Sequence, residues 1–329
     1  MTYAPPTPKD ISDSQNQEAQ LRLLRAVRRL YSKAKFWANV RGVGLGVVAV
    51  VAPLTVAVKP DLATTSASVA AAWFVLNRLV FRPLERSHAT RAATVQEQFD
   101  SRIFGMPTIA VRDPQVLPEE VTRLTGKRLA RRKAFSDDRL RDWYPINKAV
   151  PGPVAVAIAQ RGNLAYTQEL LRRSANLWAG VVAVWAVAAF VIGLVADFTL
   201  ENFLLAIVLP VLPPLLDAAD EWQRVRAAGK ERRALTIEIQ DAIHANSQAP
   251  ISGEQLLGWQ SQLFSLRRDS PLVPDWLYSI LRSGIEREMK DTAKSLGAAR
   301  ESDNESSDGP VPPRPHRHRL PEDLHHRGS

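Results

Sequence analysis

The stretch that decides the fold covers residues 174–217 and reads SANLWAGVVAVWAVAAFVIGLVADFTLENFLLAIVLPVLPPLLD. Residues 174–196 contain no charged side chain, and a second uncharged run covers residues 202–216. An α-helix rises about 1.5 Å per residue and the hydrocarbon core of a bilayer is ~30 Å thick, so the first run is long enough to cross a membrane. The second run is shorter and needs flanking residues or local thinning to do so. The stretch predicts a transmembrane hairpin; the alternative is a hairpin buried in a large soluble core.

An earlier part of the chain repeats this pattern. Two apolar runs, at residues 42–58 and 62–81, are separated only by Lys59-Pro60-Asp61. A connector of three residues makes the two helices antiparallel neighbours. Glycines at positions 42, 44 and 46 stand at the start of the first run, where small residues permit close contact between helices. The sequence therefore predicts an all-α protein with four transmembrane helices in two hairpins.

The distribution of basic residues predicts the orientation of these hairpins. The chain carries 43 Lys and Arg against 34 Asp and Glu, a net charge of +9. Lys59 is the basic residue on one side, next to Asp61. Basic residues near the ends of the runs otherwise gather on the opposite side: Arg22, Arg25, Arg28, Arg29, Lys33, Lys35, Arg41, Arg78, Arg82, Arg86, Arg91, Arg161, Arg172, Arg173, Arg224, Arg226, Lys230, Arg232 and Arg233. Since cytoplasmic flanks are rich in Lys and Arg, both termini and the central segment are expected in the cytoplasm. Topology and lipid headgroups explain the basic charge without a nucleic-acid polymer as partner.

The remaining segments complete the expected organisation. Residues 1–13 are expected to be disordered, and residues 14–41 to form a basic amphipathic helix opened by a Ser14/Gln17 capping box. That helix either lies on an anionic membrane surface or packs on its own cytosolic domain. The cytosolic domain is expected at residues 82–173, a helical cytosolic region at 217–296, and a disordered tail at 297–329.

Sequence signatures of enzymes are missing. The chain has no cysteine, and it contains no HExxH or GxSxG motif. We therefore expect no catalytic residue, no metal site and no cofactor.

Two stretches are candidates for a functional role. A basic helix expected over residues 118–133 could bind an anion such as a nucleotide phosphate through Lys127, Arg128, Arg131 and Arg132, although a solvated helix face is the simpler explanation of these residues. Proline removes backbone hydrogen bonds that lipid does not replace. The fourth apolar run contains Pro210, Pro213 and Pro214 and is followed by Asp217. These residues predict either a moving gate in the fourth span or an ordinary kinked helix.

Several short motifs together resemble the SMODS-associated four-transmembrane effectors, a family of bacterial defence proteins described as pore formers. The order of the motifs between the hairpins carries the resemblance over about residues 15–297. Their residues are Phe99, Asp100, Phe104, Pro107, Asp142, Trp143, Tyr144, Pro145, Gln160, Arg161, Asn163, Pro274, Asp275 and Trp276.

The resemblance implies an effector of the bacterial inner membrane that acts in an antiphage system. A neighbouring synthase would make a cyclic oligonucleotide, the cytosolic part would sense it, and a homo-oligomer would open a lethal leak in the lipid bilayer. One alternative is a membrane-anchored receptor or scaffold whose spans only tether it. Another is a small transporter, which is disfavoured because no ionisable residue lies in the middle of a span.

Overall fold

The computed structural model describes residues 3–107, 115–126, 140–195 and 209–273, and these are all-helical, with no strand among them. The α-helices in chain order are α1 (Pro8–Gln15), α2 (Glu18–Val58), α3 (Ala63–Leu76), α4 (Arg82–Ile103), α5 (Pro118–Leu124), α7 (Gly152–Val195), α9 (Leu209–His244) and α10 (Gly253–Arg268). Short 3-10 turns cover Pro60–Leu62 and Ala245–Ser247, and a π-helical segment, η2, covers Asn77–Phe81.

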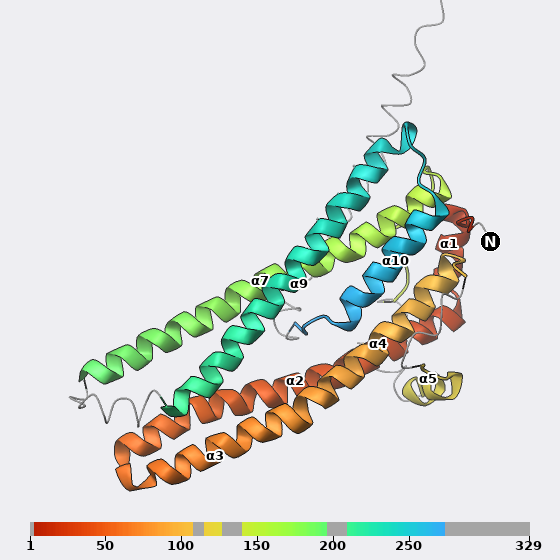
Figure 1. Cartoon of the computed structure of the whole chain (residues 1–329). Coiled ribbons are helices and arrows are strands. Elements are labelled where there is room, and N and C mark those ends of the chain that lie inside the picture. Colours follow the sequence, from red (N-terminus) through yellow and green to blue (C-terminus); the bar gives the residue numbers. More distant parts are fainter. Residues whose placement is uncertain (1–2, 108–114, 127–139, 196–208, 274–329) are drawn as a thin grey trace, which may run out of the picture.

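The long helices form two antiparallel pairs that run the length of the molecule (Figure 1). Helix α2 packs along α4, and α7 packs along α9. At one end of the molecule α10 lies between the two pairs and contacts α4, α7 and α9. The α2–α3 connection and the end of α7 lie at the opposite end (Figure 1).

The hydrophobic core lies at the end of the molecule that contains α10. Its buried side chains come from α1, α2, α4, α7, α9 and α10, and include Ile11, Leu24, Phe99, Val156, Ile239 and Leu263. A smaller cluster farther along the α7–α9 pair is built on Leu171 and Val225. Burying side chains of this size stabilises the fold by about 1.5–3 kcal/mol each.

The N-terminal segment differs from the expected disorder. Helix α1 covers Pro8–Gln15. It is opened by a capping box of Thr7 and Asp10, with Pro8 in the first turn, where proline fits a helix. Ile11 is fully buried, so the helix is held by the core as well as by its cap. The predicted capping box was misplaced, since Ser14 lies inside α1.

Helix α2 decides between the two alternatives for the basic amphipathic segment. Its apolar side chains Leu24, Val27, Leu30 and Ala34 are almost completely buried in the protein's own core. The segment therefore packs on its own domain, and its helix continues without interruption into the apolar run that ends at Val58.

Several helix boundaries agree with the sequence pattern and one does not. Helix α7 is continuous from Gly152 to Val195, and α3, η2 and α4 follow one another without a break. The helix that begins at Pro118 was predicted to reach residue 133, but α5 ends at Leu124.

The four predicted transmembrane helices are not confirmed. Among the described residues, no helix combines the length and apolar character that a membrane crossing requires. The apolar runs do form helices, and they carry most of the exposed hydrophobic surface. Of the 22 large hydrophobic side chains exposed in the described residues, 19 lie in the four runs, Val58 and Val184 among the most exposed.

Candidate functional site

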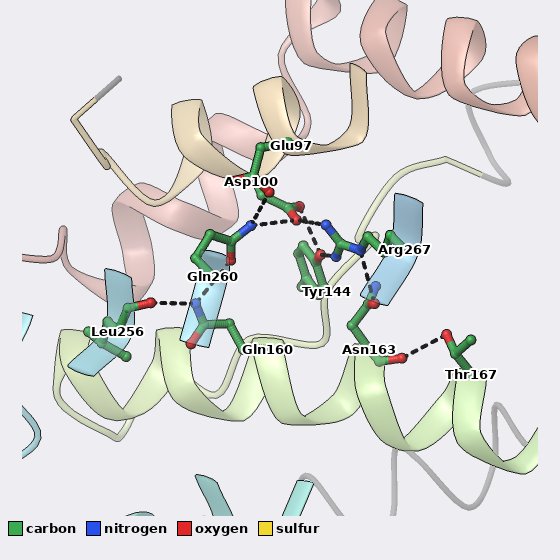
Figure 2. Close-up of polar contacts among 9 residues, drawn as sticks. All are labelled: Glu97, Asp100, Tyr144, Gln160, Asn163, Thr167, Leu256, Gln260 and Arg267. Carbon is green, nitrogen blue, oxygen red and sulfur yellow. Dashed lines mark hydrogen bonds and ion pairs between the residues drawn. The ribbon is translucent and has the colours of Figure 1, made fainter. Parts of the chain in front are cut away.

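Four of the residues on which the family resemblance rests meet in one buried polar network (Figure 2). Asp100 comes from α4, Tyr144 from the loop before α7, and Gln160 and Asn163 from α7. Three further members come from α4 and α10: Glu97, Gln260 and Arg267. We call these seven residues the Asp100 network. Motif residues that are far apart along the chain thus meet at one place in the fold.

The centre of the network is an ion pair between Asp100 and Arg267. Asp100 is completely buried and Arg267 is 7% exposed. The Nη1 of Arg267 lies 2.5 Å from Oδ2 of Asp100. The hydroxyl of Tyr144 donates to Oδ1 of Asp100 at 2.8 Å and accepts from Nη2 of Arg267 at 3.3 Å. Each charged atom therefore faces a partner of opposite polarity.

The environment fixes the protonation of this centre. Burial, and then the Asp100 carboxylate, raise the pKa of Tyr144 well above its ordinary value of 10.0, so the phenol stays a hydrogen-bond donor. Burial lowers the pKa of Arg267, but the nearby Asp100, Tyr144 and Glu97 together outweigh burial and raise that pKa. The guanidinium is therefore always charged.

Two glutamines extend the network to a third helix. The amide of Gln260 donates to Oε2 of Glu97 at 2.7 Å and to Oδ2 of Asp100 at 3.2 Å. The amide of Gln160 donates to Oε1 of Gln260 at 2.9 Å and to the Leu256 carbonyl at 3.1 Å. Together with the 3.3 Å bond from Nε of Arg267 to Oδ1 of Asn163, these contacts join α4, α7 and α10.

Local sequence features place these side chains. Helix α4 ends at Ile103 and is followed by Phe104 and Gly105; Gly105 has φ 62°, and the Met106 N–H donates to the Ser101 carbonyl. Glycine accepts this left-handed conformation without strain, which ends the helix one turn after Asp100. Helix α10 is opened by a capping box of Ser252 and Gln255. Its buried face repeats at helical spacing through Leu256, Gln260, Leu263 and Arg267.

The loop that carries Tyr144 is held by the end of α1. The side chain of Gln15 exchanges two hydrogen bonds with the backbone of Tyr144, at 3.0 and 3.2 Å. The side-chain oxygen of Asn16 accepts from the Asp142 backbone N–H at 3.0 Å, and its side-chain amide donates to the Asp142 carboxylate at 2.9 Å. The φ of Asp142, 49°, is left-handed. Asp142 is therefore a surface loop residue whose role is to shape the turn.

The remaining motif residues surround the network or lie away from it. The ring of Tyr144 lies 5.5 Å from that of Phe104 and 6.3 Å from that of Phe99, between centroids. Trp143 is half-buried beneath the Arg28 guanidinium, and Arg161 donates to Gln240 on α9 at 2.8 Å. Pro107 and Pro145 are exposed, and Pro274, Asp275 and Trp276 lie outside the described residues.

The Asp100 network has a structural role, because it holds α4, α7 and α10 together. Asp100 and Arg267 pair with each other, and the other members are buried except Asn163, which is half-buried. Removing one member of such a pair leaves an uncompensated buried charge, which typically costs about 3–5 kcal/mol. Among the described residues no group of three or more His, Asp or Glu side chains is placed to hold a metal ion.

The predicted anion-binding residues are outside the part of the chain that the structure describes, whereas the predicted gate residues are inside it. Lys127, Arg128, Arg131 and Arg132 lie outside the described residues, beyond the end of α5. Pro210, Pro213 and Pro214 lie within α9, which begins at Leu209. Pro210 therefore stands in the first helical turn, where a missing N–H breaks no helical hydrogen bond.

Asp217 belongs to a second polar cluster, at the border between the core and the apolar ends of the helices. Oδ1 of Asp217 lies 2.9 Å from Nη2 of Arg82, and Oδ2 accepts from Nδ2 of Asn77 at 2.6 Å. Arg41 of α2 lies 3.1 Å from Glu85 and 3.7 Å from Glu221. We call these residues the Asp217 cluster: Arg41, Asn77, Arg82, Glu85, Asp217 and Glu221.

The π-helical segment η2 explains why Asn77 and Arg82 reach the same carboxylate. The N–H of Arg82 donates to the Asn77 carbonyl, a hydrogen bond between residues five apart. This wider turn stacks the two residues one above the other, whereas an α-helical turn would separate them around the axis. As a result η2 and α4 both contribute to the contact with α9.

Sequence reasoning missed most of these partners because each looks ordinary in its own segment. Glu97 and Arg41 read as solvated charges beside many others. A usable signal existed for Gln260 and Arg267, since both continue the apolar stripe of Leu256 and Leu263 and therefore point into the core.

The comparisons with known proteins agree with the motif pattern. The SMODS-associating 4TM effector domain matches residues 9–296. A protein of Bacillus cereus (strain VD146), described as a probable CBASS effector molecule, is 23% identical over 294 residues, covering 86% of this chain and 95% of the relative. No solved structure matches. Because the domain matches nearly the whole of the described chain, the protein belongs to the SMODS-associating 4TM effector family.

Proposed function

We propose that this protein is an antiphage effector that is activated by a cyclic oligonucleotide and disrupts the bacterial inner membrane as a homo-oligomeric pore. The observation that carries the proposal is the concentration of exposed apolar side chains. Nineteen of the 22 exposed large hydrophobics of the described residues lie in the four apolar runs. Family membership and the relative described as a probable CBASS effector support the defence role.

The exposed apolar surface needs a partner. Val47, Val58, Leu79 and Val187 are each more than half exposed, and covering side chains of this kind is worth about 1.5–3 kcal/mol each. Exposed apolar side chains that gather in this number mark contacts with lipid or with other subunits. We propose that both occur, with lipid around the outside of the assembly and other copies of the chain at the remaining faces.

The helices offer a direct route from a cytosolic signal to the membrane. Helices α2, α7 and α9 each run from the core into an apolar run, and α4 is joined to α3 through η2. The Asp100 network ties α4, α7 and α10 together at the cytosolic end. A rigid displacement of these helices by a ligand would therefore move their apolar ends.

Within this mechanism we propose that the proline segment at the start of α9 is the moving part. Pro213 and Pro214 each remove a helical N–H, so this turn is held by fewer hydrogen bonds than an ordinary helix. Replacing both by leucine is expected to suppress leak without lowering protein abundance. Leak at the parental level would place the gate elsewhere.

The proposed function is tested by measuring growth and the entry of a membrane-impermeant dye in bacterial cells that express the full chain, with and without a cyclic-oligonucleotide synthase. We expect leak and growth arrest only when both are present. Val47→Lys and Val187→Lys should abolish leak, because a lysine in the middle of a span costs about 2.5–3.5 kcal/mol.

Ile237→Lys is the matched control, since Ile237 is 48% exposed on α9 but lies outside the apolar runs. Its leak should equal that of the parent. Growth arrest without dye entry would favour the receptor or scaffold alternative, and absence of both would contradict an effector role.

A further inference from the structure

A polar cavity of about 320 Å³ lies beside the Asp217 cluster, between α2, α4, α9 and the segment that follows α10. Five arginines line it: Arg41, Arg82, Arg86, Arg224 and Arg268. These residues come from four separate parts of the chain, so the tertiary fold alone brings them together. No sequence motif marks them as a set.

The charges around this cavity do not cancel. Arg82 pairs with Asp217, Arg41 with Glu85 and Glu221, Arg224 with Glu221, and Arg268 with Asp269. Five guanidinium groups thus face four carboxylates. Arg86 is exposed and has no carboxylate partner among the described residues. The cavity therefore carries an excess of positive charge.

The strongest sign of a missing ligand is a buried donor. Arg82 is 8% exposed, and its Nε–H has no hydrogen-bond partner within the described part of the chain. Burial lowers the pKa of Arg82, and the Asp217 carboxylate opposes that shift. An unsatisfied buried donor is rare in folded proteins and usually indicates a bound water or ion.

We propose that this cavity binds a phosphodiester group. Guanidinium groups bind phosphate oxygens through paired, charge-assisted hydrogen bonds, and several arginines from different elements form a typical phosphate site. A volume of about 320 Å³ is at the lower end of ligand pockets and suits a phosphodiester with one attached group. Cyclic oligonucleotides and lipid headgroups both supply this chemistry, and the nucleotide source rests on the proposed function.

Occupancy of the cavity has a mechanical consequence. A phosphodiester competes with Asp217 and Glu221 for the guanidinium groups of Arg82 and Arg41. These ion pairs hold α9 against α2 and α4 at the base of the apolar runs. Their exchange for ligand contacts frees the start of α9, next to the proline segment.

The test measures binding to the purified full chain in an uncharged detergent by calorimetry. One arm uses cyclic di-AMP, cyclic di-GMP, cyclic GMP–AMP and cyclic tri-AMP, with adenosine and guanosine as controls. The other uses dioctanoyl phosphatidylglycerol, with dioctanoylglycerol as the matched lipid without a phosphate. Binding in the first arm assigns the site to a nucleotide, and in the second to a lipid headgroup.

Arg86→Gln and Arg268→Gln are the test variants, because both side chains are exposed and their loss leaves no buried carboxylate unpaired. Each should weaken phosphodiester binding at least tenfold. Arg233→Gln is the matched control, an exposed arginine of α9 that does not line the cavity, and its affinity should equal that of the parent.

The proposal is overturned if the parent binds neither class of phosphodiester, or if the test variants bind as tightly as Arg233→Gln. Dye entry in cells separates this result from the proposed function. A parent that leaks but fails the binding test keeps its effector role and loses this site. A parent that binds through Arg86 and Arg268 but never leaks keeps the site and loses the pore.

Discussion

Two neighbouring arginines at the end of α10 show how burial changes the contribution of an ion pair to stability. Arg267 is 7% exposed and pairs with the fully buried Asp100, whereas the side chain of Arg268 is 43% exposed and pairs with Asp269 on the surface. An exposed pair contributes at most about 1 kcal/mol, because water screens it. A buried pair is far more costly to break, because its carboxylate is left without a counter-charge.

Arg267→Met should therefore lower the free energy of unfolding by about 3–5 kcal/mol, and Arg268→Gln by less than about 1 kcal/mol. Thermal unfolding of the purified full chain, followed by circular dichroism, measures both. Adding Asp100→Asn to Arg267→Met should recover part of the loss, since the unpaired carboxylate is then removed. Equal losses for the two single arginine variants would show that the Asp100 network does not hold the helices together.

The buried phenol of Tyr144 predicts a loss of stability at alkaline pH. In the unfolded chain this group titrates near 10.0, whereas in the folded protein burial and Asp100 raise its pKa well above that value. Above pH 10 the folded state therefore holds a proton that the unfolded state has released. By linkage, the stabilisation is complete below pH 10 and is lost as pH rises through the folded pKa.

Unfolding temperatures measured from pH 8 to pH 11.5 test this dependence. Tyr144→Phe should start less stable, because the hydrogen bond to Asp100 is gone, and should lose less stability than the parent above pH 10. Parallel curves for the two proteins would contradict the role given to the phenol.

At the scale of the elements, Gly44 sets the distance between α2 and α3. A Cβ atom built at Gly44 would overlap the indole ring of Trp73, whereas nothing lies within 4 Å of one built at Gly42 or Gly46. The Trp73 ring is itself packed against Phe81, with centroids 5.3 Å apart. The glycine pattern read from the sequence as close helix contact thus applies to Gly44.

Gly44→Ala should accordingly destabilise the α2–α3 pair, while Gly42→Ala and Gly46→Ala should be neutral or slightly stabilising, because alanine favours helix by up to about 1 kcal/mol over glycine. The unfolding temperatures of the three variants give the comparison. A stabilised Gly44→Ala would mean that Trp73 moves aside at no cost and that the contact does not fix the helix spacing.

At the scale of the whole molecule, the charge distribution predicts the arrangement across the membrane. The α2–α3 connection contains Lys59 beside Asp61, whereas the opposite ends of the helices carry many arginines. Reporters of compartment fused within the full chain after Lys59 should therefore be extracytoplasmic, and those at Lys127 and Gly297 cytoplasmic. A reporter at Lys127 that is active outside the cytoplasm would overturn the arrangement.

The amino-acid sequence by itself determined the helical class, the long continuous helices and the family. These follow from local rules, since helical periodicity, apolar runs and motif order are readable along one segment at a time. The same rules failed at α1, where a capping box and one buried side chain, Ile11, made a helix in a segment that looked too polar to order.

Only the tertiary structure decided which polar residues act together. Asp100 and Arg267 are 167 residues apart, and Asn77 and Asp217 are 140 apart, yet each pair shares a hydrogen bond. Chain positions so far apart leave no local trace of their contact, because either side chain alone resembles a solvated surface residue. The burial that makes these charges consequential is a property of packed helices, and it arises only when α4, α7, α9 and α10 come together.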